Sequence, residues 1–315
     1  MVSSTNNTGI QVTEFLMICF PGMQDTQHWL SIILAPLLVL ALAANFVLLF
    51  TIHQEASLHE PMYYLLAILS VLDVILCLTV IPKVLLIFWF NMKPISFVGC
   101  FLQMFIMNTF LPMESSMFLV MAYDHYVAIC HPLCYPSIIT EQFVINADIF
   151  IVACNLLATL PTPVLAARLN YCASNVVENC ICANISVAKL SCGDIHLNKL
   201  YQFVSVLCLL GSDLVLILLS YCFILRVVLC QQSGGAVTKA LSTCGSHLIL
   251  ILFFYTLLLV FIFTNKAGKK ILSEVPILLN VLPHLIPPAL NPTVYGVGTQ
   301  EIKQGIIKLF KQKSS

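Results

Sequence analysis

The chain has 315 residues, of which 60% are hydrophobic and only 9% are charged, and its formal net charge at pH 7 is zero. An ordinary soluble domain has roughly 25% charged residues, so this chain could not cover its apolar surface in water and is predicted to be a membrane protein. Its neutral balance gives no indication of a nucleic-acid partner or of an acidic substrate.

The first 28 residues are predicted to form a polar tail, followed by a first membrane helix near residues 29–52. The tail lacks the basic and apolar regions of a cleaved signal peptide, so the first helix should itself act as the insertion signal. Asn6 begins an Asn-Asn-Thr sequon and is a predicted glycosylation site. Asn45 lies inside the helix and should bond to a neighbouring helix, because an unpaired buried amide costs about 1–3 kcal/mol.

Six further apolar segments follow, and each is long enough to cross the hydrocarbon core of a bilayer. They run over residues 61–88, 100–124, 141–160, 196–229, 239–266 and 274–296. Pro161 and Pro163 are expected to end the fourth segment, and residues 164–195 form the only long hydrophilic connection. Together with the first helix, these segments predict an all-α bundle of seven membrane helices over residues 29–296.

Residues 297–315 are basic and amphipathic. A helix here would place lysines on one face and four apolar side chains on the other, those of Ile302, Ile306, Leu309 and Phe310. This pattern predicts a short eighth helix that lies on the membrane surface. No cysteine follows it, so we expect no palmitate on this helix.

An odd number of crossings places the two termini on opposite sides of the membrane. The basic residues do not say which side is which, because six of the 14 Lys and Arg fall on the side of the C-terminus and eight on the other. The sequons at Asn6 and Asn184 and a cysteine-rich loop all lie on the side of the N-terminus, where they fit an oxidising, glycosylating compartment. We therefore predict a plasma-membrane protein with its N-terminus outside and its C-terminus in the cytoplasm.

Two acidic residues lie deep inside apolar helices, Asp73 in the second and Glu114 in the third. Each is about 15–18 Å from the inner end of its helix, so the two share a depth. Carboxylates at one level of a bundle repel each other unless one is protonated or a cation lies between them. Asp148 and Asp213 are assigned packing or helix-end roles.

The chain has 14 cysteines, and most lie in apolar segments, where a free thiol behaves as a small hydrophobe. Cys100 begins the third helix. Four others lie in the loop 164–195, namely Cys172, Cys180, Cys182 and Cys192. Five thiols on an oxidising side allow several disulfide pairings. A zinc site with His196 as a further ligand is the alternative, which we disfavour because cysteines outside the cell tend to oxidise.

Five short sequences, in order along the chain, carry a family resemblance. They are PMYY at 61–64, MAYDHYVAIC at 121–130, SY at 220–221, KALSTCGSH at 239–247 and PPALNPTVYG at 287–296. With these strings the chain resembles vertebrate olfactory receptors, which are rhodopsin-like G-protein-coupled receptors, and its FPGM and LHEPMY runs resemble the class I, fish-like branch. The resemblance covers almost the whole chain. It implies a receptor, not an enzyme, that binds a small, mostly apolar odorant in the outer half of the bundle and activates a stimulatory, olfactory G protein.

The resemblance also implies two disulfide bonds and a cation site. One bridge would join Cys100 to Cys182 and fold the loop 164–195 over the bundle as a lid. The other would join Cys172 to Cys192, which leaves Cys180 unpaired or competing. A sodium pocket would be formed by Asp73, Glu114, Ser115 and Asn291. The alternative is a neutral, hydrogen-bonded pair of acids that only joins helices.

Activation and G-protein coupling in the family imply a further set of residues, which are Asp124, His125, Tyr126, Tyr221, Lys239, Pro292 and Tyr295. The family has arginine where this chain has His125, and commonly arginine where it has Cys134 and Cys230. Histidine is shorter than arginine and lacks its permanent charge, so we expect a lower signalling output. The alternative function is therefore a seven-span receptor with impaired coupling. For Pro292 the alternative is a purely structural kink.

By family position, the odorant would contact Met104, Met107, Asn108, Ser205, Tyr255 and Ile262, with Ile185 on the lid. Such a pocket is apolar with few polar groups and suits small hydrophobic volatiles. The methionines fit core packing equally well. Lys266, one turn beyond Ile262, either binds a ligand carboxylate or extends its ammonium to the membrane surface, and we favour the second.

Transporters and channels are the competing class of protein. They would show internal repeats or helices broken at matching places in the two halves, and the sequence shows neither. Ser246 and His247 are the nearest match to a nucleophile and its base. They are adjacent, so they point to different faces of a helix, and the sequence does not favour an enzyme.

Overall fold

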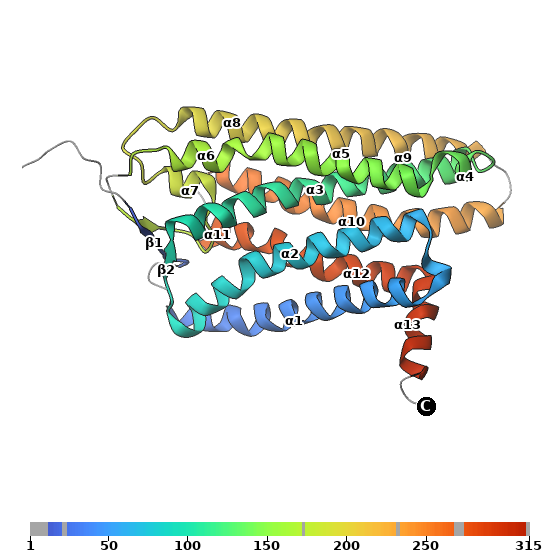
Figure 1. Ribbon diagram of the computed structural model, residues 1–315, viewed down its shortest axis with the longest axis horizontal. Coiled ribbons are helices and arrows are strands. Elements are labelled where there is room, and N and C mark those ends of the chain that lie inside the picture. The colour runs from blue at the N-terminus through green and yellow to red at the C-terminus, as the bar shows by residue number, and fades with distance from the viewer. Residues whose placement is uncertain (1–11, 21–23, 172–173, 231–233, 268–273, 313–315) are drawn as a thin grey trace, which may run out of the picture.

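The computed structural model describes residues 12–20, 24–171, 174–230, 234–267 and 274–312. Among the described helices, six are long and apolar enough to cross a membrane, with mean hydropathy from 1.3 to 2.7. They are α1 (Gln24–Gln54), α2 (Pro61–Phe90), α3 (Phe97–Cys130), α5 (Glu141–Thr159) continued by α6 (Pro161–Ala167), α8 (His196–Val206) continued by α9 (Ser212–Cys230), and α10 (Gly234–Ala267). Figure 1 shows them running along one long axis as a bundle.

The last crossing is broken, where the sequence predicts one segment over residues 274–296. Helix α11 (Glu274–Val281) leads into a 3-10 turn over Leu282–His284, and α12 (Ile286–Gly298) completes the span. Pro283 lies in the turn and further prolines begin α12, and proline has no N–H to donate to a continuous helix. With this span the predicted bundle of seven membrane helices is confirmed.

The fourth crossing does not end at its prolines, so that prediction was wrong. Leu160 keeps helical backbone angles, and Pro161 takes the first position of α6, where a helix needs no N–H donor. The first crossing also differs from the prediction, because α1 begins at Gln24 instead of near residue 29. Other boundaries follow local signals: Ser96 caps α3 by accepting from the Gly99 N–H at 3.1 Å.

A small sheet covers one end of the bundle, where the sequence predicts only a polar tail. Strand β1 (Glu14–Met17) pairs antiparallel with β2 (Pro94–Ser96) and parallel with β3 (Val176–Val177), giving the order β2-β1-β3. Phe15 is fully buried, and its ring packs against those of Phe97 and Tyr171. The segment before α1 is therefore part of the folded cap at the left of Figure 1.

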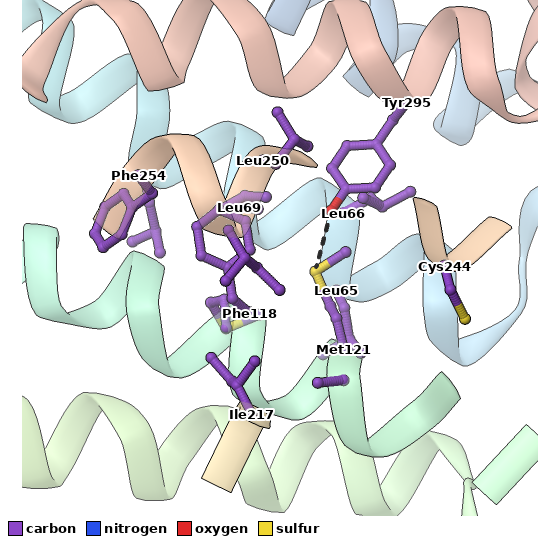
Figure 2. Close-up of a cluster of buried hydrophobic side chains, with 14 of the residues drawn as sticks. Leu65, Leu66, Leu69, Phe118, Met121, Ile217, Cys244, Leu250, Phe254 and Tyr295 are labelled. Carbon is purple, nitrogen blue, oxygen red and sulfur yellow. Dashed lines mark hydrogen bonds between the residues drawn. The ribbon is translucent and has the colours of Figure 1, made fainter. Parts of the chain in front are cut away.

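The core fills the axis of the bundle with side chains from nearly every crossing. Figure 2 shows Leu65 and Leu69 of α2 meeting Phe118 of α3 and Phe254 of α10, all of them buried. Many large apolar side chains on the outer circumference are exposed instead, which fits helices whose outer faces meet lipid. Asn45 donates to the Pro288 carbonyl at 2.8 Å, so the predicted bond from Asn45 to a neighbouring helix is confirmed.

The predicted eighth helix is confirmed as α13 (Gln300–Gln312), which turns away from the bundle axis at the end opposite the sheet. Ile302 is buried and Ile306 packs against the core, whereas the lysines face outward. The Lys308 ammonium meets the Glu55 carboxylate at 3.0 Å, which joins α13 to the chain just after α1. The side chain of Phe310, predicted for the apolar face, lies outside the described residues.

Candidate functional site

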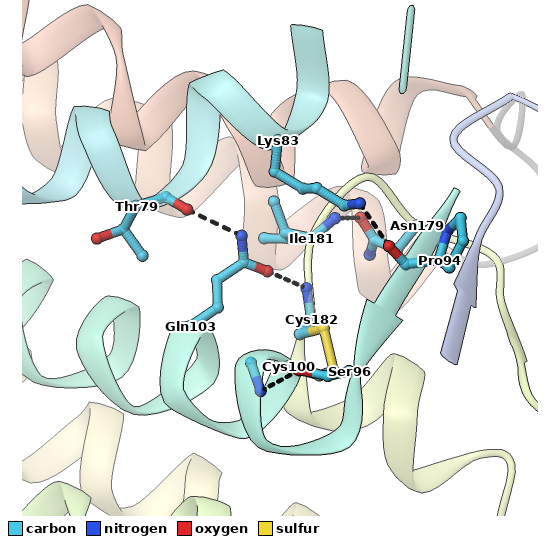
Figure 3. The surroundings of a disulfide bond; sticks show 10 residues. Thr79, Lys83, Pro94, Ser96, Cys100, Gln103, Asn179, Ile181 and Cys182 are labelled. Carbon is cyan, nitrogen blue, oxygen red and sulfur yellow. Dashed lines mark hydrogen bonds between the residues drawn. A yellow bond between two sulfur atoms is a disulfide. The ribbon is translucent and has the colours of Figure 1, made fainter. Parts of the chain in front are cut away.

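A disulfide bond joins Cys100, in the first turn of α3, to Cys182 in the loop that follows α6. This is the pairing that the family resemblance implied. Gln103, one turn further along α3, accepts from the Cys182 N–H at 3.0 Å and donates to the Thr79 carbonyl of α2 at 3.0 Å (Figure 3). The loop is thus held to α3, which Gln103 joins in turn to α2, and it covers the end of the bundle as a lid.

A disulfide bond between Cys19 and Cys180 was not predicted. Cys180 is bonded to Cys19, which precedes α1, so the prediction that Cys180 is left unpaired or competing was wrong. Cys192 is also disulfide-bonded, but its predicted partner Cys172 lies outside the described residues. These bonds consume the thiolates that a zinc site with His196 would need, and the described part of the chain holds no group of three or more metal-ligating side chains.

The two predicted glycosylation sites have different outcomes. Asn6 lies outside the described residues, so its glycosylation stays a prediction. Asn184 begins helix α7 (Asn184–Ala188) and is buried, and its amide donates to the Gln202 side chain of α8 at 2.9 Å. An amide enclosed in this way is not available to a glycosyltransferase. The folded structure therefore argues against a glycan on Asn184, whose glycosylation stays a prediction to be tested.

We expect that Asn184→Gln leaves the glycan on the protein unchanged, because no glycan is attached there. Asn6→Gln is the matched variant and should remove the glycan. The measurement is the gel mobility of each variant with and without endoglycosidase treatment. A glycan that is lost with Asn184→Gln and kept with Asn6→Gln would show that the enclosed amide opens during biosynthesis.

The residues expected to contact an odorant do not all gather in one place. Met104 is buried with Cys182 in one cluster beneath the lid, and Met107 is buried with Cys180 in the neighbouring one. Asn108 donates to the Met104 carbonyl within its own helix at 2.8 Å, and Ser205 is half-buried. Ile185 and Ile262 are 39% and 38% exposed, so neither is enclosed. The side chain of Lys266 lies outside the described residues.

Tyr255 of α10 joins a buried polar network below the two methionines. Its hydroxyl hydrogen-bonds the Ser115 hydroxyl at 2.6 Å and donates to the Leu210 carbonyl at 3.2 Å. Leu210 lies in a π-helical turn, Leu207–Gly211, between α8 and α9, and such turns change the carbonyl pattern of a helix and often occur at functional sites. The Ser115 hydroxyl also donates to Asp213 of α9 at 2.9 Å. The network thus connects α3, α9 and α10.

This network corrects two predictions. Ser115 was assigned to the sodium pocket, but its hydroxyl points to α9 and α10 and is engaged there. Asp213 was assigned a packing or helix-end role, but it is a central acceptor, because Ser116 also donates to it at 3.0 Å.

The two deep acids do lie together in the middle of the bundle. Asp73 and Glu114 are fully buried, and each carboxyl group interacts with the other. Asn291 of α12 donates to both Asp73 oxygens, at 3.1 Å each. Within the described residues, neither Glu114 oxygen receives a hydrogen bond from a donor group. Two adjacent buried acids with unfilled oxygens need a shared proton or a bound cation.

A second polar cluster, formed by residues of α3, α9 and α10, lies toward the end of the bundle opposite the sheet. His125 is buried, with Nδ1 3.4 Å from the Asp124 carboxylate, and its ring centre is 5.2 Å from that of His247. His247 Nδ1 in turn bonds the Tyr221 hydroxyl at 2.5 Å. His125 therefore points into the bundle and faces a second histidine.

Neighbouring tyrosines complete this cluster. Tyr135, the first residue of the short helix α4 (Tyr135–Ile138), donates to Asp124 at 2.9 Å. Burial and the Asp124 carboxylate raise the pKa of the Tyr135 hydroxyl, so it keeps the proton that it donates. Tyr295 of α12 places its hydroxyl 4.0 Å from the Met121 sulfur (Figure 2), and Tyr126 bonds His131 at 3.2 Å. The side chain of Lys239 lies outside the described residues.

Known proteins match this chain along nearly its whole length. A family model described as olfactory receptor matches residues 34–313. Human olfactory receptor 56A4 is 64% identical over 312 residues, which cover 99% of this chain and 100% of that receptor. Human olfactory receptor 56A1 is also 64% identical, with coverage of 99% and 98%. The chain belongs to the olfactory receptor family.

More distant receptors of the family match the same extent of chain. Human olfactory receptor 56B2 is 50% identical over 307 residues, 98% of this chain and 97% of its own. The receptor is thus a multi-pass membrane protein that responds to odorants through a G protein, and it is not an enzyme. Of the strings that carried the resemblance, those at 121–130 and 287–296 supply Asp124, Asn291 and Tyr295 to the clusters described above.

Three residues of the receptor's sites were missed from the sequence. Cys19 could have been found, because it is the only cysteine before the first membrane helix and five thiols on one side leave one over. Gln103 and His247 carried no such signal. A glutamine one turn after Cys100 reads as an ordinary helix residue, and His247 was considered only as a partner of Ser246.

Proposed function

We propose that the receptor binds a small apolar odorant beneath its lid, between Met104 and Met107 of α3 and Tyr255 of α10. The observation that carries this proposal is the fixed position of the lid, which Cys182 and Gln103 hold over the outer part of α3. Buried methionines suit such a site, because their flexible thioether side chains adapt to ligands of varied shape.

Odorant contact at Tyr255 would act on the network below it. The Tyr255 hydroxyl is shared between Ser115 and the π-helical turn of Leu207–Gly211, so a ligand that displaces it alters bonds on three crossings. We propose that these altered bonds transmit odorant binding in the outer half of the bundle to the inner ends of α9 and α10. There the receptor would contact a stimulatory, olfactory G protein.

Orientation is part of the same proposal. Two disulfide bonds lie at the end that holds the sheet, whereas Cys134 and Cys230 at the other end are free thiols. Disulfides form in oxidising compartments and cytoplasmic thiols stay reduced. We therefore place the sheet and the lid outside the cell and α13 on the cytoplasmic surface.

The odorant site is tested with a panel of volatiles applied to cells that express the receptor with an olfactory G protein. For the best agonist, Tyr255→Phe should lower the half-maximal concentration by up to about tenfold, because the odorant no longer has to displace a hydroxyl whose hydrogen bonds to Ser115 and Leu210 contribute about 0.5–1.5 kcal/mol each. Ile262→Ala is the matched control and should leave it unchanged, since Ile262 is not enclosed. The proposal fails if only Ile262→Ala alters the response.

We also propose that a sodium ion binds at Asp73 and Glu114, with Asn291 orienting Asp73. The residues fit the ion, because Glu114 offers two carboxylate oxygens with no donor among the described residues. A sodium ion would supply the positive charge that two adjacent carboxylates lack. Ser115 is not part of this site, since its hydroxyl is engaged by Asp213 and Tyr255.

Sodium is tested by the thermal stability of the purified receptor in sodium chloride and in choline chloride of equal ionic strength. With sodium about tenfold above its dissociation constant, the wild type should gain about 1.4 kcal/mol. Glu114→Gln should abolish this difference, whereas Asp148→Asn, on another helix, should keep it. Equal stability of the wild type in the two salts would favour the neutral pair of acids instead.

A further inference from the structure

A groove of about 540 Å³ lies on the circumference of the bundle, where the receptor meets lipid. Helix α3 packs against both α5 and α9, so it forms the floor and the other two form the walls. The lining is apolar and includes Leu119 and Tyr123 of α3, Phe143 of α5, and Leu216, Leu219 and Phe223 of α9. The hydroxyl of Ser220, also in the wall, donates to the Leu216 carbonyl at 3.0 Å, so this hydroxyl already has a hydrogen-bond partner.

The wall formed by α9 continues to a free thiol. Its groove residues Leu216, Leu219 and Phe223 are three or four positions apart, so they share one face of the helix. Cys230, the exposed last residue of α9, is two such turns beyond Phe223 and therefore lies on the same face. Cys230 therefore lies on the line of the groove, about 10 Å beyond Phe223 toward the inner end.

The surroundings of Cys230 are those of a membrane boundary. Leu229 is 82% exposed, and Leu133, in the loop after α3, is 97% exposed. Large apolar side chains left bare at the end of a bundle are covered by lipid. From Cys230 to Leu216 is about 21 Å along the helix, a distance that an extended long-chain acyl group spans.

We propose that Cys230 is S-acylated with a long saturated fatty acid, and that the acyl chain lies in the groove between α5 and α9. In this step the Cys230 sulfur attacks the carbonyl carbon of an acyl-coenzyme A. The new sulfur–carbon bond forms as the thioester bond to coenzyme A breaks, and coenzyme A leaves as its thiol with the proton lost by Cys230. The inference rests on the proposed orientation, which puts Cys230 on the side of the cytoplasm.

Other exposed cysteines serve as matched controls. Cys222 is on the same helix, but it is eight residues from Cys230, about 12 Å deeper in the membrane, and off the face that lines the groove. Cys134 is at the same end of the bundle, on the loop after α3. Both are exposed thiols, so they control for labelling of any accessible cysteine.

The experiment feeds an alkyne-bearing palmitate analogue to cells that express the full-length receptor, and detects the label that hydroxylamine releases. The wild type should be labelled, Cys230→Ser should lose the label, and Cys222→Ser and Cys134→Ser should keep it. Absence of label in the wild type, or label that persists in Cys230→Ser, overturns the proposal. Cys230 is exposed, so its replacement by serine should not prevent folding.

The position of the chain is tested with an analogue that also carries a diazirine near its methyl end. After irradiation, peptides of α3 that contain Leu119 should carry the adduct, and Leu219→Trp, which fills the groove, should remove the adduct but keep the label. Adducts confined to membrane lipids overturn the assignment of the acyl chain to the groove.

A separate measurement distinguishes a failure of orientation from a failure of acylation. In the proposed orientation, the Cys134 thiol reacts with a membrane-impermeant maleimide only after the cells are permeabilised. Reaction in intact cells contradicts the orientation, and with it the acylation of Cys230 from the cytoplasm. Reaction only after permeabilisation, in a receptor that carries no acyl label, contradicts the acylation alone.

Discussion

Cys182→Ser is expected to lower the amount of receptor at the cell surface several-fold. The Cys100–Cys182 bond closes a long stretch of chain and fixes the lid above the bundle, and loss of a native disulfide typically costs about 2–5 kcal/mol. The variant keeps the backbone N–H at position 182, so the hydrogen bond to Gln103 would have to hold this part of the lid to α3 without the disulfide. Surface amount is measured by flow cytometry with a tag on the N-terminus.

The double variant Cys100→Ser with Cys182→Ser tests whether the bond itself is responsible. Both single changes break the same bond, so the double variant should be no worse than either one. Cys222→Ser, which removes an exposed free thiol, should leave the surface amount unchanged. If Cys182→Ser is expressed like the wild type, the lid does not depend on this disulfide.

The bundle could be predicted from the sequence because each crossing must satisfy its backbone polar groups within itself. Long runs without charge therefore mark the helices, and the run between Thr26 and Gln54 corresponds closely to α1. The cap at the outer end obeys no such local rule. Strand β1 pairs with segments about 80 and 160 residues away, and its length of four residues gives no periodic pattern.

Side-chain direction explains the mixed success at the acids. Glu114 was predicted at the depth of Asp73, and the structure brings the two together. Ser115 is the next residue of the same helix, so its side chain points about 100° away and meets Asp213 and Tyr255. The depth of a residue in the membrane can be predicted by counting residues along the helix. Which helix its side chain faces can be predicted only when the neighbouring helices are known.

Free thiols could be recognised in the sequence, but their surroundings could not. Cys134 and Cys230 were noted only as positions where the family commonly has arginine. The groove near Cys230 is built from three crossings that are separated by long stretches of chain, so no local sequence pattern predicts it.

His125→Arg is expected to increase odorant-evoked cyclic AMP at equal surface expression. His125 is enclosed between Asp124 and His247, so its short side chain does not extend out of the bundle. Arginine carries a permanent charge on a longer side chain, which can pair with Asp124 in one state and extend outward in another. The measurement is the maximal response of a cyclic-AMP reporter to the same agonist.

The control is His53→Arg, which adds the same charge at the same end of the receptor but at an exposed position in the last turn of α1. It should leave the maximal response unchanged. His247→Phe tests whether the contact of His125 with His247 limits signalling, separately from its contact with Asp124. If the contact with His247 is responsible, His247→Phe should also raise the maximal response. An unchanged or lower response of His125→Arg contradicts the proposal that this histidine limits signalling, because the charge would then have been restored without effect.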